Sequence, residues 1–170
     1  SYLRFLDCFR AHIVNGPFLL GSRPGSADFA TYGQLTQLAQ FDPTPRAETL
    51  ARAPQVFAWV DLVDDLSGLD LESASFFDRD AIPDTLRGLL SEVGRVYAPA
   101  LLANAAAVES GAEQVETEIA GKAWVQQPFP YQARCLQWLR AAYVRLDGDD
   151  RVVVDKLLEG TGCEVLFRKP

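Results

Sequence analysis

The sequence lacks methionine altogether, and among its 170 residues it has one histidine, His12, and three cysteines, Cys8, Cys135 and Cys163. An odd number of widely spaced cysteines excludes the dense disulfide framework of a small secreted domain and predicts a reducing, cytoplasmic location. A single histidine with scattered thiols also argues against a transition-metal site. Because the chain opens in helical sequence without a methionine, we expect it to be part of a longer polypeptide.

Positive charge is scarce as well, because 16 lysines and arginines stand against 23 acidic residues, for a formal net charge of −7. Such a surface repels phosphate groups, so neither nucleic acid nor an anionic membrane is an expected partner. No apolar run approaches the roughly 20 residues of a membrane-spanning helix. The hydrophobic share of 48% is enough for a real core, and the length predicts a single domain over residues 1–170.

The first part of the chain has helical periodicity, with apolar residues three and four positions apart. Helices are expected over residues 2–14, 26–40 and 54–67, and Pro54 stands at the favoured first helical position. Segment 41–45, which contains two prolines, is expected to break the second helix. The expected core positions are Leu3, Leu6, Phe9 and Ile13, then Phe29, Tyr32, Leu35 and Ala39, then Val56, Trp59, Val60 and Val63.

The remainder begins with an acidic loop over residues 68–81, which contains one apolar plug, Phe76-Phe77. Helical periodicity then resumes. Pro99 is expected to break or kink it, and the acidic turn that starts at Asp147 is expected to cap the last helix. The helices expected in this part cover residues 83–98, 99–109, 131–146 and 151–159.

The periodicity changes to strict alternation at residues 115–119, where apolar or β-branched positions alternate with polar ones. Gly121 supplies a turn and residues 123–127 return, which predicts a β-hairpin. Alternation in the C-terminal tail marks a candidate third strand, formed by Cys163, Val165 and Phe167. The predicted fold class is therefore mainly α, a helical bundle with a small β-hairpin near the C-terminus.

Residues 21–29, Gly-Ser-Arg-Pro-Gly-Ser-Ala-Asp-Phe, resemble the segment that opens a central helix in the C-terminal domain of glutathione transferases. In that family a Ser or Thr precedes an Asp by three residues and forms a capping box, in which the acidic side chain reaches back to the cap. Here Asp28 holds the acidic position, Gly25 replaces the Ser or Thr, and Ser26 is an alternative cap. A Pro-x-Val-x-x-Trp-Val run at residues 54–60 also stands at the family's usual spacing from the Asp.

The resemblance covers residues 1–67 and implies the all-helical C-terminal domain of the glutathione transferase fold, with residues 68–170 as an extension packed on it. In the family, a Tyr, Ser or Cys of a thioredoxin-like N-terminal domain stabilises the thiolate of glutathione. This sequence shows no counterpart of that domain. We therefore assign no catalytic, cofactor-binding or metal-binding residue and expect the chain alone to be inactive.

The resemblance further implies that the helical domain supplies a wall of the apolar second-substrate site. Tyr2, Phe5 and Phe9 are the candidates for that wall, with core packing as the alternative interpretation. Glutathione is implied as cofactor only for the longer polypeptide, with the thioredoxin-like domain as partner in cis. A homodimer is an open alternative, because relatives often dimerise.

A non-catalytic protein-interaction module with the same helical fold is the second hypothesis. An acidic set would be its docking patch for a basic partner, although a solvated helix face explains the same residues. That set is Asp61, Asp64, Asp65, Asp70 and Glu72. Trp124, Trp138 and Tyr143 are assigned to the core or to an interface. His12 has no acidic partner at helical spacing, so we interpret it as a partly buried helix residue rather than a general base.

Overall fold

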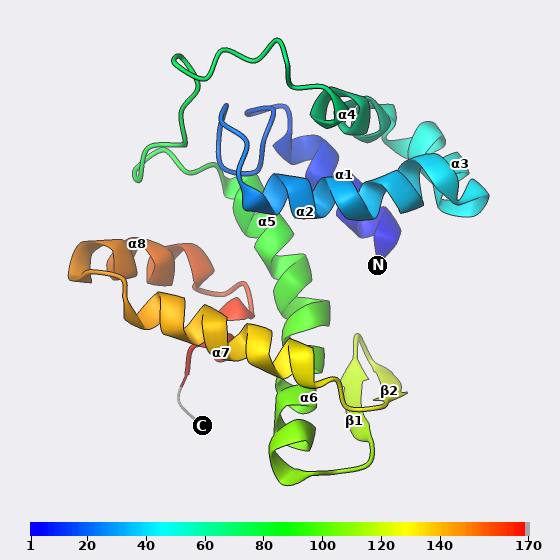
Figure 1. The fold of residues 1–170 in the computed structure, drawn as a ribbon, viewed down its shortest axis with the longest axis vertical. Coiled ribbons are helices and arrows are strands. Elements are labelled where there is room, and N and C mark those ends of the chain that lie inside the picture. Colours follow the sequence, from blue (N-terminus) through cyan, green and yellow to red (C-terminus); the bar gives the residue numbers. More distant parts are fainter. Residues whose placement is uncertain (169–170) are drawn as a thin grey trace. The chain divides into compact units, whose positions relative to one another are not determined.

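A computed structural model describes residues 1–168, which are mainly helical with one small antiparallel hairpin (Figure 1). This confirms the predicted fold class. The chain divides into two compact units, which we call unit 1 (Ser1–Leu89) and unit 2 (from Leu90 onward). The division falls inside a helix rather than at residue 67, where the family resemblance ends. The packing of residues 68–170 onto residues 1–67 as one domain stays a prediction.

Unit 1 contains the three helices that the periodicity predicts, together with one that it does not. The second predicted helix continues through a π-helical segment to Phe41, and the third ends at Asp64 rather than near Ser67. The elements are α1 (Tyr2–His12), α2 (Ser26–Leu35), the π-helix η1 (Thr36–Phe41), α3 (Pro43–Arg52), α4 (Pro54–Asp64) and the first part of α5 (Asp84–Glu92).

The core of unit 1 gathers the buried faces of α1, α4 and η1. Phe9 of α1 meets Trp59 of α4 edge to face, with 4.8 Å between ring centroids, an arrangement that aromatic pairs favour. All four predicted core positions of α4 are buried. In α2, however, Phe29 is 50% exposed, so its assignment to the core is wrong. The helix instead turns inward the face of Asp28 and Leu35, which are two turns apart.

Helix α3 corrects the expectation that segment 41–45 only breaks the chain. Asp42 takes an extended conformation, and its Oδ1 accepts a hydrogen bond from the backbone N of Thr44 at 3.2 Å. Pro43 then stands at the first helical position, where its missing N–H leaves no helical hydrogen bond unmade. The same residues that end one helix therefore start the next.

The acidic loop after α4 has no regular helix or strand before α5, apart from an isolated bridge between Gly21 and Phe76. Of the two residues of the predicted apolar plug, Phe76 and Phe77, only one points toward the core. Phe77 is half-buried with its ring against His12, at 6.3 Å between centroids, whereas Phe76 is about half exposed. The backbone of the loop joins the segment before α2, because Phe77 N donates to Leu20 O at 2.7 Å.

Unit 2 is a smaller helical assembly around α6. Its core cluster is formed by Ala98 and Leu101 of α6, Leu136 of α7 and Leu166. The buried Asn104 of α6 binds both backbone groups of Phe129, accepting from its N at 2.7 Å and donating to its O at 2.9 Å. The elements are the end of α5, the π-helix η2 (Val93–Tyr97), α6 (Ala98–Ser110), β1 (Val115–Ile119), β2 (Lys122–Gln126), α7 (Pro130–Val144), α8 (Gly148–Leu158) and the 3₁₀ helix η3 (Cys163–Leu166).

The π-helical turn of η2 lies just before Pro99, which was expected to break or kink the helix. A proline ring clashes with the carbonyl four residues earlier in an α-helix, and wider π spacing in the preceding turn is a way to continue the helical course. Gly94 in the same turn lies against the backbone of residues 161–163. A Cβ at Gly94 would come within 2.1 Å of Thr161 O, so only glycine fits there.

The hairpin is confirmed, with Thr117 opposite Trp124 and a two-residue turn at Ala120-Gly121. Both turn residues have positive φ, 51° and 79°, as a type I′ turn requires. The prediction of a third strand is wrong. Cys163 and Leu166, three residues apart, are buried by a 3₁₀ helix that Gly162 starts with a φ of 82°. The sheet of the described residues 1–168 therefore has two strands.

Candidate functional site

The carboxylate of Asp28 lies at the centre of the most elaborate polar arrangement in unit 1. The residue is only 1% exposed. Its Oδ2 accepts from the backbone N of Gly25 at 2.8 Å, the hydrogen bond of the predicted capping box. Its Oδ1 accepts from the backbone N of Leu19 at 2.7 Å, which the sequence does not predict. One side chain thus caps α2 and holds the α1–α2 loop (residues 13–25).

The cap residue itself is Gly25, in an extended conformation, and Ser26 is the first residue of the helix. The alternative cap at Ser26 is therefore not the one used. Because Gly25 has no side chain, it contributes only backbone groups: its N–H donates to Asp28, and its carbonyl accepts from Asp28 N at 3.0 Å. Half of the reciprocal box is missing, and the reach of Asp28 to Leu19 adds a hydrogen bond elsewhere.

His12 holds the same loop from the other side and is fully buried, not partly buried as expected. Its Nε2 lies 2.9 Å from Leu19 O, which can only accept, so Nε2 carries a proton. Its Nδ1 lies 2.9 Å from Thr85 Oγ1, which also accepts from Asn15 Nδ2 at 3.1 Å. The ring therefore donates to the Leu19 carbonyl on one side and contacts the Thr85 hydroxyl on the other. Both ring nitrogens are therefore occupied in a structural role.

Further contacts complete the clamp on the α1–α2 loop. Trp59 Nε1 donates to Pro17 O at 2.6 Å. Gly21, at a φ of 140°, lies so close to the loop before α5 that a Cβ would come within 2.5 Å of Ser75 O. The backbone from Pro17 to Gly21 is thus fixed by α1, α2, α4 and the acidic loop together. The part that Pro17 and Ser75 play could not be predicted from the sequence, because they make these contacts through backbone oxygens to residues far apart in the chain.

The three candidate wall residues form an aromatic row along α1. Ring centroids lie 6.3 Å apart between Tyr2 and Phe5 and 5.3 Å apart between Phe5 and Phe9. Phe9 is fully buried against Trp59, so it serves the core and cannot reach a ligand. Tyr2 and Phe5 are half-buried above it. Of the three candidate wall residues, Tyr2 and Phe5 are therefore the two that offer an apolar surface.

The hydroxyl of Tyr2 has a defined role within unit 1. It lies 2.6 Å from Thr49 Oγ1, whose own proton goes to Pro45 O at 2.7 Å, so Tyr2 is the donor to Thr49. Burial raises the pKa of Tyr2, against a smaller lowering by the bond to Thr49. The hydroxyl therefore stays protonated at neutral pH and orients the ring.

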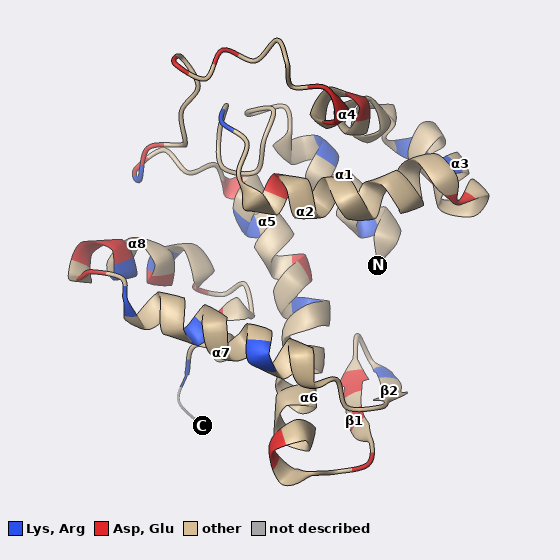
Figure 2. Ribbon diagram, in the orientation of Figure 1, with Lys and Arg blue, Asp and Glu red and all other residues tan. Residues whose placement is uncertain are grey.

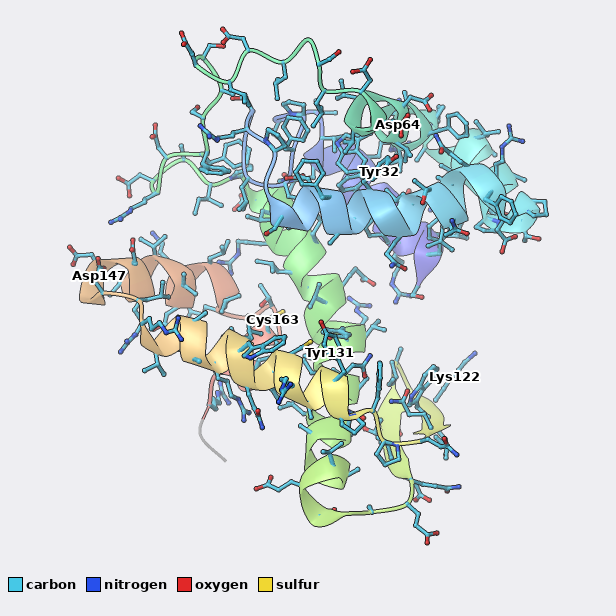
Figure 3. All side chains as sticks on the ribbon, in the orientation of Figure 1. Tyr32, Asp64, Lys122, Tyr131, Asp147 and Cys163 are labelled. Atoms are coloured by element: carbon cyan, nitrogen blue, oxygen red, sulfur yellow. The ribbon has the colours of Figure 1, made fainter. Side chains whose placement is uncertain are left out.

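The acidic residues of α4 and the following loop, red in Figure 2, make hydrogen bonds within unit 1. Asp61 accepts a hydrogen bond from Gln40. Asp64 accepts one from the hydroxyl of Tyr32, and both of these residues are labelled in Figure 3. Asp65 and Asp70 accept from backbone N–H groups two residues on, and hydrogen bonds to Ser67 and Ser73, respectively, lower the pKa values of these two carboxyls. Four of the five residues of the acidic set thus accept local hydrogen bonds through their carboxylates.

Unit 2 exposes a cluster of neighbouring aromatic side chains around the start of α7. Tyr131, labelled in Figure 3 at the start of α7, lies between two aromatic neighbours, tilted against Phe129 at 6.2 Å and edge to face with Trp138 at 6.1 Å between ring centroids. Trp138 is 55% exposed, and the guanidinium of Arg134 lies 5.9 Å from its ring centroid. We call Phe129, Tyr131, Arg134 and Trp138 the aromatic surface. Such exposed clusters are typical of interaction sites.

Tyr143, the third residue assigned to core or interface, borders a depression in unit 2. Its ring packs on Phe167 at 4.6 Å between centroids, and its hydroxyl donates to Asp155 Oδ1 at 2.5 Å, a bond that raises the pKa of Tyr143. Glu164 and Arg168 also line the depression. Charged residues of both signs line the depression, and the Tyr143 hydroxyl is engaged with Asp155.

Residues 1–62 match the family model described as glutathione S-transferase, C-terminal domain. The matched segment runs from α1 into α4 and includes Asp28 and the loop that it holds. No curated protein and no solved structure gave a significant match. In residues 1–168 no helix is long and apolar enough to cross a membrane, and no cluster of His, Cys, Asp or Glu is arranged to hold a metal ion.

Proposed function

We propose that unit 1, whose residues 1–62 match the glutathione S-transferase C-terminal domain family, shapes the apolar second-substrate site of a glutathione-dependent transferase. The half-buried rings of Tyr2 and Phe5 form its wall. A thioredoxin-like N-terminal half in the same polypeptide binds glutathione and activates its thiol. The 170-residue chain alone is inactive, and its three cysteines, which form no disulfide, suit a cytosolic setting.

The observation that carries the proposal is the aromatic row on α1. Phe9 anchors the row in the core, and the hydrogen bond to Thr49 orients the outermost ring, so that Tyr2 and Phe5 present a preorganised apolar surface. Ligand sites are lined mostly by such apolar and aromatic groups, with few polar ones. This surface suits an apolar electrophile better than a charged tripeptide, which supports the assignment of glutathione to the other half.

The chemistry of unit 1 supports inactivity of the chain on its own. The pKa of Tyr2 is raised, which opposes the use of its hydroxylate, and its proton is donated to Thr49. The imidazole of His12 is enclosed, with both nitrogens bonded. Neither residue is free to abstract a proton from a thiol in solution.

A two-part assay tests the proposal. The 170-residue chain is incubated with glutathione and 1-chloro-2,4-dinitrobenzene, and we expect no conjugation above the uncatalysed rate. The chain fused to the thioredoxin-like half encoded upstream should conjugate. In that fusion, Phe5→Ala should raise KM for the electrophile several-fold, whereas Leu3→Ala, on the same helix but outside the aromatic row, should leave it unchanged.

Conjugation by the 170-residue chain itself would overturn the inactivity of the isolated chain. Equal kinetics of the Phe5→Ala and Leu3→Ala variants would contradict the proposal that the aromatic row lines the second-substrate site. Circular dichroism on each variant separates a lost contact from a lost fold.

The aromatic surface of unit 2 favours a second candidate function, a non-catalytic interaction module. Phe129, Tyr131 and Trp138 are all more than half exposed, and aromatic residues of this kind are enriched at protein interfaces. The upstream coding sequence discriminates between the two. A thioredoxin-like segment with a Tyr, Ser or Cys at its first turn favours the transferase, and a different fused domain favours the module.

A further inference from the structure

Strand β2 has an open edge with apolar side chains. Its residues 122–125 are exposed, including Trp124 at 46% and Val125 at 59%. On its other side β2 pairs with β1, which packs against α6. Natural proteins usually protect such an edge with charges, proline or a bulge, because it can pair with another strand. The single charge on β2 is Lys122, at its start.

The register determines which backbone groups of β2 face outward. The two-residue turn makes Ile119 and Lys122 a hydrogen-bonded pair, and the pairs alternate along an antiparallel ladder. Trp124 and Gln126 therefore use their backbone groups toward β1. Those of Ala123 and Val125 point to the open edge, where a further strand would meet them.

We propose that a second copy of this chain pairs its β2 antiparallel with this β2 about a twofold axis at Trp124. Ala123 and Val125 of one copy then exchange backbone hydrogen bonds with Val125 and Ala123 of the other. Trp124 faces its own symmetry mate as a non-hydrogen-bonded pair, where cross-strand side chains lie closest and aromatic pairs stabilise. The two hairpins join into one continuous sheet.

The sequence of β2 is self-complementary in this arrangement. Lys122 of one copy stands opposite Gln126 of the other, and Ala123 opposite Val125, so that no like charges meet. The hydrogen bond from Trp124 Nε1 to Gln126 Oε1, 3.1 Å long, already orients the indole on one face of the strand. Isologous contacts of this kind close as dimers.

The outer strand β1 could not serve in the same way. By the same alternation Glu116 and Glu118 have the outward backbone groups of β1, and self-pairing would place these carboxylates opposite each other. The charge pattern of the hairpin therefore directs association to β2 and leaves the acidic strand on the outside.

Light scattering after size exclusion on the full 170-residue chain tests the proposal. We expect a species of twice 18.7 kDa that dissociates on dilution, because the contact is small. Val125→Pro removes one outward N–H without touching the ladder to β1 and should abolish the dimer. Val125→Thr keeps that N–H and should retain it. A monomer at every concentration, or a Val125→Pro variant that still dimerises, would overturn the proposal.

Cysteine cross-linking checks the register independently of strand stability. Residues of a non-hydrogen-bonded pair are close enough for a disulfide, so Trp124→Cys should oxidise to a dimer through position 124 of both copies. Val125→Cys faces Ala123 of the second copy and should give little 125–125 disulfide. Peptide mass spectrometry distinguishes these bonds from those of the native cysteines. Equal yields at both positions would contradict the proposed axis.

Discussion

Unit 1 and unit 2 differ in where their tryptophans lie, because Trp59 of unit 1 is buried and the two tryptophans of unit 2 are exposed. Unit 1 buries aromatic rings such as Phe9 and Trp59 and also buries polar side chains, His12 and Asp28, each of which fixes loop backbone. Unit 2 leaves Trp124 and Trp138 on its surface. Buried polar groups that are fully hydrogen-bonded specify one arrangement, whereas exposed aromatic groups are available to partners. The tryptophans of unit 2 are therefore accessible to a partner, whereas Trp59 of unit 1 is not.

The largest expected effect contrasts an aromatic residue of each unit. Phe9→Ala should lower the free energy of unfolding by about 4 kcal/mol, because the buried ring leaves a cavity beside Trp59. Trp138→Ala should cost less than about 1 kcal/mol, because the ring is more than half exposed and does little for the core. Urea denaturation followed by circular dichroism measures both. Equal losses would remove the contrast between the units.

Asp28→Ala should give the next largest effect, a loss of about 3 kcal/mol in unit 1. The substitution leaves the part-buried N–H groups of Leu19 and Gly25 without their carboxylate acceptor, and hydrogen bonds to a charged group contribute about 1.5–3 kcal/mol each. Ser26→Ala, two residues away and without a capping role, is the matched control and should change stability by less than about 0.5 kcal/mol. The same urea titration would refute the clamp if the two variants behaved alike.

Within unit 2, Asn104→Ala should cost about 2 kcal/mol, since both backbone groups of Phe129 lose their buried partner. Ser110→Ala, at the exposed end of the same helix, should be nearly neutral. Native-state hydrogen exchange of α6 and α7 amides measures the loss where it occurs. If α1 and α4 lost as much protection as α6 and α7, the two units would not be separate in stability.

The smallest effect concerns the ion pair between Asp7 and Arg52, which is exposed and therefore weak. The hydrogen bonds from Arg52 hold the pKa of Asp7 below its ordinary value of 3.8. A lowered native pKa means that the stabilisation is present above the ordinary value and is lost as pH falls through the native one. Asp7→Asn should therefore be slightly less stable than the parent at pH 7 and equal to it in strong acid. A difference that grew in acid would contradict this sign.

Sequence patterns predicted those parts of the fold that depend on neighbours along the chain. The stripe of α4 follows from its spacing, the hairpin from its alternation, and the cap at Asp28 from the Gly25-to-Asp28 interval. Helix α3 was missed because Pro43 can end one helix or begin another, and only the Asp42 cap decides between them. This is an ambiguity of the local sequence.

The clamp around the α1–α2 loop was beyond prediction for a different reason. His12 and Thr85 lie 73 residues apart, and Leu19 and Pro17 take part through backbone atoms that any residue has. The tail was misassigned because three alternating positions, Cys163, Val165 and Phe167, are too few to distinguish a strand from a 3₁₀ turn. Long-range backbone contacts leave no periodic signal in the sequence.

The central claim is that Asp28 holds the α1–α2 loop to the start of α2. Hydrogen exchange of the Leu19 and Gly25 amides tests this claim most directly. In the native chain both amides should exchange slowly, and in Asp28→Ala both should exchange at rates close to those of an open loop. The amide of Trp124 in the hairpin should be protected equally in both proteins. Fast exchange of Leu19 and Gly25 in the native chain, or unchanged protection in the variant, would contradict the account.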